Sequence, residues 1–180
     1  MPNILYKTQV YLVGHMQYSN GRNWRIQIKK ELEKMNITVF DPYDKPFINS
    51  RIENEEKRAE LQKMMIEQQY DEVSAHMKQV RAEDLRLCDI STFIIAHINP
   101  SIASWGSAEE IFWSNRLKKP IFLSVEGGKS QTPLWIMGTI PHKYIYNNWE
   151  ESLDMVRKID NGEVEIDSDR WRLLRPEFRN

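Results

Sequence analysis

The chain has 180 residues and a formal net charge of −1, with 25 Lys and Arg against 26 Asp and Glu. Its composition, 41% hydrophobic and 28% charged, is that of one globular domain and excludes a disordered or fibrous chain. Because cations and anions balance, there is no positive surplus to attract a nucleic-acid polymer, and we expect no binding of one. A local phosphate pocket is still compatible with this balance.

Cys88 is the single cysteine, which excludes an intramolecular disulfide and a multi-cysteine zinc site and favours a reducing compartment. Residues 1–7 lack the basic, apolar and small-residue order of a signal peptide. No apolar run approaches the ~20 residues that a membrane span needs. We therefore expect a cytoplasmic protein without membrane association.

The first 40 residues have the pattern of a βαβ unit. An apolar run at residues 10–13 predicts a buried strand that ends at Gly14, and a polar loop at residues 15–23 follows it. A helix is predicted next, and then a short strand at residues 37–40. One face of this helix is apolar and consists of Trp24, Ile28, Leu32 and Met35.

The remainder continues the alternation of helices and strands. Residues 49–87 are charged and rich in helix formers and predict two helices, the second with Val73, Met77 and Val80 as an inward stripe. Residues 92–96 are typical of a strand buried on both faces of a parallel sheet, and a loop at residues 97–106 follows. The later predicted elements are a helix at 107–117, a strand at 121–123, a short helix at 134–137, a strand at 144–146 and a helix at 149–159.

This order predicts an α/β fold: a flavodoxin-like, doubly wound, five-stranded parallel sheet with flanking helices. We assign residues 1–160 to this domain and residues 161–180 to a C-terminal tail that packs on the domain or on a partner subunit. In such folds ligands bind outside the carboxyl ends of the strands, where the strand order reverses. That point lies between the first and third strands, so the loops that begin at Gly14 and His97 form the predicted site.

Three segments near this crevice carry groups with chemical potential. Gly21 and Arg22 precede a helix, where N–H groups and a guanidinium suit an anion, although the spacing is not that of a P-loop and a turn with a solvated cation is the simpler interpretation. Ser107 and Glu110 match the Ser-x-x-Glu capping box, which closes a helix end and needs no further role. Asp84 is expected near a helix end, where a carboxylate is usually solvated surface.

Together these segments bring two carboxylates, Glu110 and Asp84, toward one crevice with a candidate anion site. Paired carboxylates suit the cleavage of an N-glycosidic bond. One attacks the anomeric carbon while the other protonates the departing base.

The sequence resembles the nucleoside 2-deoxyribosyltransferases and the related nucleotide N-glycosidases from residue 10 to about residue 159. The resemblance rests on short motifs that agree with that family in order and spacing. These motifs are Tyr11-Leu12-Val13-Gly14, Trp24-Arg25, Asp41-Pro42, Asp84-Leu85, Gly106-Ser107-Ala108-Glu109-Glu110-Ile111 and Lys119-Pro120-Ile121.

The resemblance implies roles for individual residues: Glu110 is the nucleophile, Asp84 is the acid/base residue beside the nucleobase, and Tyr11 helps to place the nucleophile. At the position of Ser104, transferases that act on free nucleosides have an Asp, whereas the deoxynucleoside monophosphate N-glycosidase has a Ser. A hydroxyl can donate a hydrogen bond to a phosphate, while a carboxylate repels it. Ser104 and the Gly21-Arg22 pair therefore imply recognition of a 5′-phosphate.

The other residues expected to bind substrate lie in the two predicted loops and at the helix start that follows the second. They are Gly14, His15, Trp105, Gly106 and Ser107. A solvated side chain is the alternative for His15, and packing against a neighbouring subunit is the alternative for Trp105.

The resemblance further implies a homo-oligomer, a dimer or larger, with a nucleotide or nucleoside as substrate. No cofactor is expected. No metal site is expected either, because the histidines do not have the spacing of ligands.

Three hypotheses follow from these residues. The first is a hydrolase that cleaves a (deoxy)nucleoside 5′-monophosphate, with water as the acceptor. The second is a 2-deoxyribosyltransferase, in which another nucleobase accepts the sugar. The third is a non-catalytic nucleotide-binding module.

Overall fold

A computed structural model describes residues 3–16, 20–164 and 170, and it confirms the predicted five-stranded parallel sheet. The strands are β1 (Gln9–Gly14), β2 (Thr38–Phe40), β3 (Phe93–Ile98), β4 (Ile121–Val125) and β5 (Ile145–Tyr146). Their spatial order is β2-β1-β3-β4-β5, and every neighbouring pair is parallel. The strand order therefore reverses between β1 and β3, as predicted.

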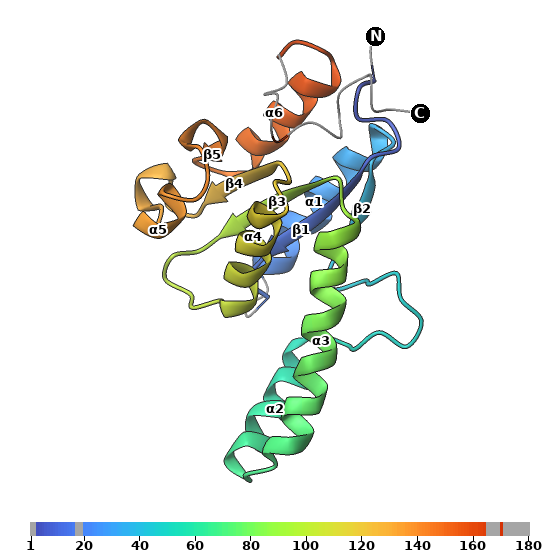
Figure 1. The fold of residues 1–180 in the computed structure, drawn as a ribbon, viewed down its shortest axis with the longest axis vertical. Helices are drawn as coiled ribbons and strands as arrows, with labels where there is room; N and C mark the ends of the chain where they lie inside the picture. The colour runs from blue at the N-terminus through green and yellow to red at the C-terminus, as the bar shows by residue number, and fades with distance from the viewer. Residues whose placement is uncertain (1–2, 17–19, 165–169, 171–180) are drawn as a thin grey trace.

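Helices cover both faces of the sheet (Figure 1). They are α1 (Asn20–Lys34), α2 (Glu55–Ile66), α3 (Tyr70–Ile90), α4 (Trp105–Arg116), α5 (Leu134–Met137) and α6 (Trp149–Asp160), with short 3₁₀ turns at Lys129–Gln131 and His142–Tyr144. The core on one face is formed with α1 and α6, and the core on the other with α3, α4 and α5. No helix in the described part of the chain is long and apolar enough to cross a membrane.

The central strand β1 shows how the sequence builds these two cores. Val10 and Leu12 belong to the core on the α1 and α6 side, whereas Tyr11 and Val13 belong to the core on the α3 and α4 side. Successive side chains of a strand point to opposite faces, so an unbroken apolar run is buried on both. Tyr11 is thereby directed toward α3 and α4.

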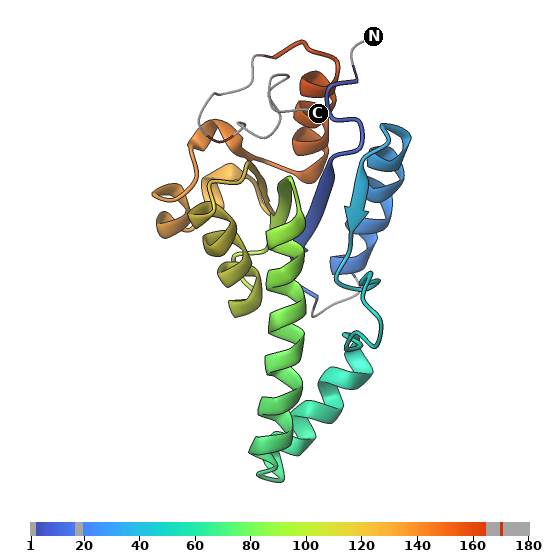
Figure 2. The same ribbon diagram turned by 45° about the vertical axis from the view of Figure 1, so that its right-hand side comes forward.

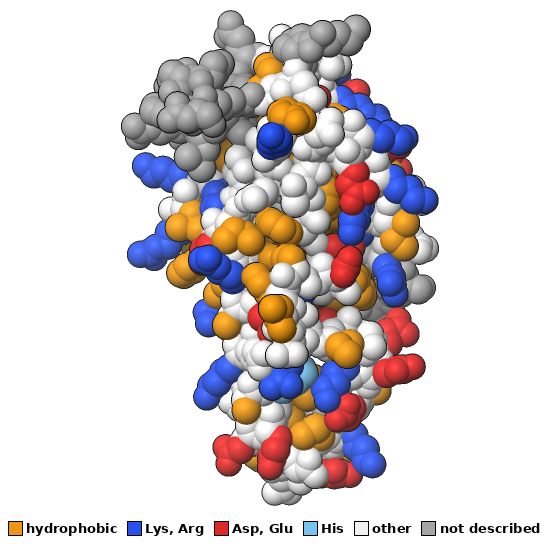
Figure 3. Space-filling view, turned by 90° about the vertical axis from the view of Figure 1, so that its right-hand side faces the viewer, with side chains coloured by type: hydrophobic (Ala, Val, Ile, Leu, Met, Phe, Trp, Pro, Cys, Tyr) orange, Lys and Arg blue, Asp and Glu red, His pale blue; other side chains and the backbone are white. Residues whose placement is uncertain are grey.

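The helices α2 and α3 form a hairpin that projects beyond the sheet (Figures 1 and 2). Helix α2 has no buried residue, and the buried residues of α3, Val80, Leu87 and Cys88, lie in its second half. Met77, which the sequence placed on the inward stripe, is 44% exposed because its part of α3 lies beyond the sheet. The hairpin surface carries Lys, Arg, Asp and Glu interspersed with hydrophobic side chains (Figure 3).

Two loops are shorter than predicted. Helix α1 begins at Asn20, so Gly21 and Arg22 lie in its first turn rather than in a loop that extends to residue 23. Strand β3 continues through His97 to Ile98, because His97 is paired in register with Gly14 of β1 and with Ser124 of β4. The loop after β3 therefore begins at residue 99.

Most of the tail assigned to residues 161–180 lies outside the described residues. Within it, the guanidinium of Arg170 donates hydrogen bonds to Oδ1 of Asn115, at 2.5 Å, and to the carbonyl of Lys119, at 3.4 Å. Arg170 thus contacts the domain near the end of α4.

Candidate active site

The carboxylate of Glu110 and the hydroxyl of Tyr11 meet in the core between α4 and β1. The Tyr11 hydroxyl donates a hydrogen bond of 2.8 Å to Oε1 of Glu110. Tyr11 is fully buried and Glu110 is 7% exposed. A carboxylate placed this deep in a core is costly unless it is hydrogen-bonded or protonated, and this cost marks Glu110 as a functional candidate.

Asp84 of α3 is electrostatically coupled to Glu110. Burial raises the pKa of Glu110 to about 8, and the nearby charge of Asp84 adds to this rise. Burial also raises the pKa of Asp84 to about 7, with the charge of Glu53 as the next cause. Near neutral pH the pair therefore retains a proton, so that one group can act as an acid while the other is a carboxylate.

A buried lysine lies beside Asp84. The Nζ atom of Lys45 is 2.8 Å from Oδ1 of Asp84 and 3.4 Å from Oε2 of Glu83, and it also forms an ion pair with Glu53. The side chain of Lys45 is 1% exposed. Burial opposes its charge, but Asp84 and Glu53 outweigh burial and raise the pKa of Lys45, so the lysine stays protonated.

Lys45 belongs to no motif that marks it as a site residue in the sequence. It follows the Asp41-Pro42 pair in the loop after β2, and this loop leaves the same edge of the sheet as the predicted site. The position of this loop at the carboxyl end of a strand was the available signal.

A second buried cation, Arg25, fixes the segment between β1 and α1. Its guanidinium donates hydrogen bonds to the carbonyl of Gly14, at 2.8 Å, to the carbonyl of His15, at 3.2 Å, and to the carbonyl of Gly21. Arg25 was missed as a buried residue, although it stands three and seven positions before Ile28 and Leu32 and so shares their face.

The two glycines of this segment permit close backbone packing. A Cβ atom at Gly14 would lie 2.5 Å from the carbonyl oxygen of His97, and one at Gly21 would lie 2.4 Å from the carbonyl oxygen of His15. Arg22 is exposed, with its guanidinium 5.3 Å from the ring centre of Tyr43. These contacts give Gly21 a packing role and place Arg22 on the surface.

A cavity of about 350 Å³ lies beside the first turns of α4. Three residues expected to bind substrate, His15, Ser104 and Ser107, line it, together with apolar side chains of α4 and α5. The hydroxyl of Ser104 donates a hydrogen bond of 2.8 Å to that of Ser107. Among the described lining residues there is no Asp, Glu, Lys or Arg, and so neither member of the carboxylate pair lines this cavity.

Two interpretations drawn from local sequence are wrong. Helix α4 begins at Trp105 rather than at residue 107, so Ser107 lies inside its first turn, and Glu110 accepts a hydrogen bond from Tyr11 instead of completing a capping box. Asp84 is not a solvated acid at a helix end, because α3 continues to Ile90 and the Asp84 side chain is 14% exposed.

The remaining candidates lie away from this cavity or are packed. Trp105 is 87% exposed, and neither it nor Gly106 lines the cavity. Burial, with the charges of His15 and Arg25, lowers the pKa of His97 to about 4, so its ring is neutral and pairs with Ser124 at 2.9 Å. Cys88 is buried, and burial raises the pKa of its thiol. In the described part of the chain, no group of three or more His, Cys, Asp or Glu side chains is arranged to hold a metal ion.

Comparison with known proteins finds no matching family model and no matching curated protein. Among solved structures, the chain is similar to a 2-deoxyribosyltransferase from Bacillus psychrosaccharolyticus, with 17% identity, a TM-score of 0.55, and coverage of 82% of this chain and 91% of that one. The two chains share a fold. A conserved protein from Enterococcus faecalis V583 has 14% identity and a TM-score of 0.48 over 93% of this chain and 95% of that one.

Proposed function

We propose that the protein cleaves the N-glycosidic bond of a (deoxy)nucleoside 5′-monophosphate, with water as the acceptor. One observation carries the proposal: the buried carboxyl of Glu110, hydrogen-bonded to Tyr11, is coupled to Asp84, and both carboxyl groups have pKa values near neutrality. A pair that holds a proton at neutral pH can supply a nucleophile and an acid at once.

In the first step, a carboxylate oxygen of Glu110 attacks C1′ and the bond from C1′ to the base nitrogen breaks. The electron pair of that bond goes to the base, which takes the proton of Asp84. In the second step, water attacks C1′ of the glycosyl ester, Asp84 accepts a proton of this water, and Glu110 leaves as a carboxylate. The Tyr11 hydroxyl holds one oxygen of Glu110 and leaves the other for attack.

The phosphate end of the substrate is assigned to the cavity beside α4. Its described lining holds the hydroxyls of Ser104 and Ser107 and the ring of His15, and no carboxylate that would repel a phosphate dianion. Arg22, which the sequence suggested for this role, does not line the cavity.

A 2-deoxyribosyltransferase is the second candidate, favoured by the shared fold with the Bacillus enzyme. It would use the same two carboxyl groups, and a second nucleobase would replace water in the second step.

The test measures base release from individual nucleotides and nucleosides, with and without an added free base. Release without an acceptor supports the hydrolase, and exchange that requires an acceptor supports the transferase. Glu110→Ala should reduce turnover at least about 10³-fold because it removes the nucleophile. If the wild-type protein releases and exchanges no base, the proposed reaction is refuted.

Glu109→Ala is the matched control for this experiment. Glu109 precedes Glu110 on α4 but lies at the surface, where it forms an ion pair with Arg81. Exposed pairs contribute little to stability, so this variant should keep turnover within about twofold of the wild type. Equal losses in the two variants would contradict the assignment of Glu110.

A further inference from the structure

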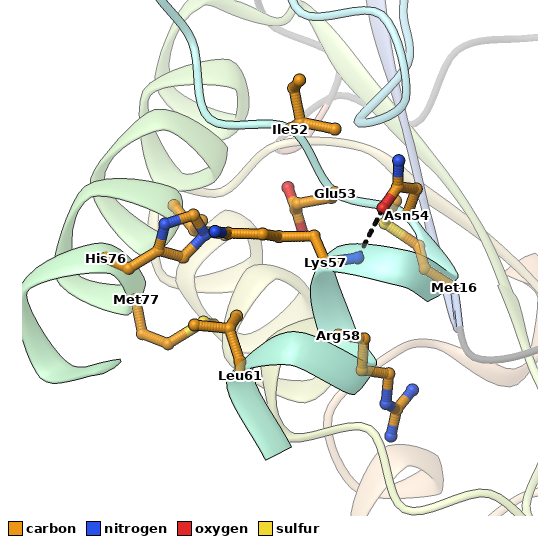
Figure 4. Close-up of a pocket in the computed structure, with 10 residues that line it drawn as sticks. Met16, Ile52, Glu53, Asn54, Lys57, Arg58, Leu61, His76 and Met77 are labelled. Atoms are coloured by element: carbon orange, nitrogen blue, oxygen red, sulfur yellow. Dashed lines mark hydrogen bonds between the residues drawn. The ribbon is translucent and has the colours of Figure 1, made fainter. Parts of the chain in front are cut away.

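Another cavity, the hairpin cavity, has a volume of about 300 Å³ and lies between the helices α2 and α3 of the projecting hairpin (Figure 4). Its walls combine apolar side chains from both helices and from the loop before α2 with several polar side chains. The residues that line it are Met16, Ile52, Glu53, Asn54, Lys57, Arg58, Leu61, His76, Met77 and Val80. Apolar walls with a few polar groups are typical of a site for a small organic molecule.

Two hydrogen-bond donors, Lys57 and His76, meet from the two helices of the hairpin cavity. Figure 4 shows the side chain of Lys57 extending toward the ring of His76. Burial lowers the pKa of His76, and the charges of Lys57 and Arg51 lower it further. The charges of Glu53 and Glu60 oppose this shift without reversing it. The ring is therefore neutral near neutral pH and has one N–H group to donate beside the ammonium group of Lys57.

The carboxylates near this ammonium group are engaged elsewhere or lie at the surface. Glu53 lines the cavity, but it forms an ion pair with the buried Lys45. Glu60 lies 2.9 Å from Nζ of Lys57, but its side chain is 57% exposed and it does not line the cavity. An exposed ion pair between residues three apart on a helix contributes little free energy. An anion inside the cavity can therefore replace Glu60 as the partner of Lys57.

The apolar walls indicate what the remainder of the ligand must be. Figure 4 shows Leu61 of α2 opposite Met77 of α3. Helix α2 has no buried residue, and Met77 is 44% exposed. Because most of the stability of a helix in a globular protein comes from the packing of its apolar face, a hydrocarbon body between Leu61 and Met77 would supply contacts that α2 lacks.

We propose that the hairpin cavity binds a monocarboxylate with an apolar body, of the class of medium-chain fatty acids. One carboxylate oxygen accepts a hydrogen bond from the ammonium group of Lys57, and the other accepts one from the ring N–H of His76. The hydrocarbon chain packs between Leu61 and Met77. Figure 4 shows the guanidinium of Arg58 turned away from Lys57 and His76, and a single ammonium group matches the one charge of a carboxylate better than the charge of a phosphate.

Calorimetry on the full chain with octanoate, acetate and octanol tests this assignment. Octanoate should bind with a dissociation constant below about 1 mM, because it has both the charge and the chain. Acetate lacks the chain and octanol lacks the charge, so each should bind about tenfold more weakly or less. Octanol binding as tight as that of octanoate would overturn the proposed role of Lys57 and His76.

Lys57→Met removes the ammonium group and keeps most of the length of the side chain. It should weaken octanoate binding about tenfold or more and leave octanol binding within about twofold of the wild type, because the hydrogen bond to a charged group is lost while the apolar walls remain. Lys63→Met is the matched control. Lys63 lies on the same helix, pairs with Glu67 at the surface and does not line the cavity, so octanoate binding should not change.

Leu61→Trp should fill the cavity and weaken octanoate and octanol alike. Met65→Trp, about one turn later on the same helix, is its control, because Met65 is 48% exposed and does not line the cavity. Circular dichroism establishes that each variant is folded, and Met77→Trp fills the cavity from the opposite wall if Leu61→Trp does not fold.

Three results would overturn the assignment: no octanoate binding at millimolar concentration, octanoate binding that Lys57→Met leaves unchanged, or octanoate binding that no folded cavity-filling variant weakens. The assignment does not depend on the proposed reaction. A protein that cleaves no nucleotide can still bind octanoate in this cavity, and a protein that cleaves nucleotides can fail to bind it, so the two proposals are tested separately.

Discussion

The hydrogen bond from Tyr11 to Glu110 can be removed with little change of shape by Tyr11→Phe. The phenyl ring keeps the packing of a fully buried side chain, while the 2.8 Å hydrogen bond to the carboxylate is lost. A hydrogen bond to a charged group contributes about 1.5–3 kcal/mol. Its loss should raise the pKa of Glu110 by about 1–2 units and reduce kcat/KM near neutral pH by roughly 10–150-fold.

The assay is kcat/KM for base release as a function of pH. The reactive form has Glu110 ionised and Asp84 protonated, and the pKa of Glu110, about 8, lies above that of Asp84, about 7, so the high-pH limb of the profile should move to higher pH in Tyr11→Phe while kcat/KM falls at neutral and lower pH. The control is Tyr146→Phe, which removes the hydroxyl of a buried tyrosine on the distant strand β5. If kcat/KM falls equally at every pH, with the limb unmoved, Tyr11 does not act through the ionisation of Glu110.

Three further predictions concern stability, pH dependence and substrate preference. The pKa of Glu110 rises from 4.5 to about 8 on folding, so the protonated Glu110 side chain favours the folded state. This contribution to the free energy of unfolding is fully present below pH 4.5 and is lost as the pH rises through 8. Glu110→Gln should therefore raise Tm relative to the wild type at pH 9 by more than at pH 5, and equal differences in calorimetry would contradict this. Lys45→Met removes the cation beside Asp84, so the pKa of Asp84 should rise above about 7 and the pH optimum of kcat/KM, which lies midway between the pKa values of Asp84 and Glu110, should move upward. Lys29→Met, a change at a more exposed lysine, should leave the pH optimum in place, and an unchanged optimum in Lys45→Met would exclude this role of Lys45. Ser104→Asp should lower kcat/KM for monophosphates relative to nucleosides about tenfold or more, and an unchanged ratio would remove the phosphate argument.

The sheet could be predicted because each strand is an apolar run bounded by polar segments. Residues 10–13 and 93–96 are buried on both faces, and this pattern belongs to parallel strands covered by helices. Helix starts were less predictable. Helix α4 begins at Trp105 although Ser107 and Glu110 match a capping box, and the carboxylate of Glu110 accepts a tertiary hydrogen bond from Tyr11.

The candidate site could be predicted only in part, because some of its contacts depend on how separate elements pack together. Tyr11 and Glu110 could be placed near one crevice from strand order, but their direct contact depends on how α4 packs across β1. Lys45 lies in a loop without periodicity, so no local pattern indicates that its charge is buried among three acids. The cavity between α2 and α3 could not be predicted either, because the segment that forms it is rich in charged residues and has the composition of a solvated surface.

The hydrogen bonds of Arg25 at the start of α1 place few demands on the side chains around them. Its three acceptors are main-chain oxygens, which every amino acid supplies, so evolution can exchange the side chain at position 15 without breaking these bonds. Gly14 and Gly21 are restricted by the lack of space for a Cβ atom. A turn held by one arginine and two glycines therefore leaves most side chains around it free to change.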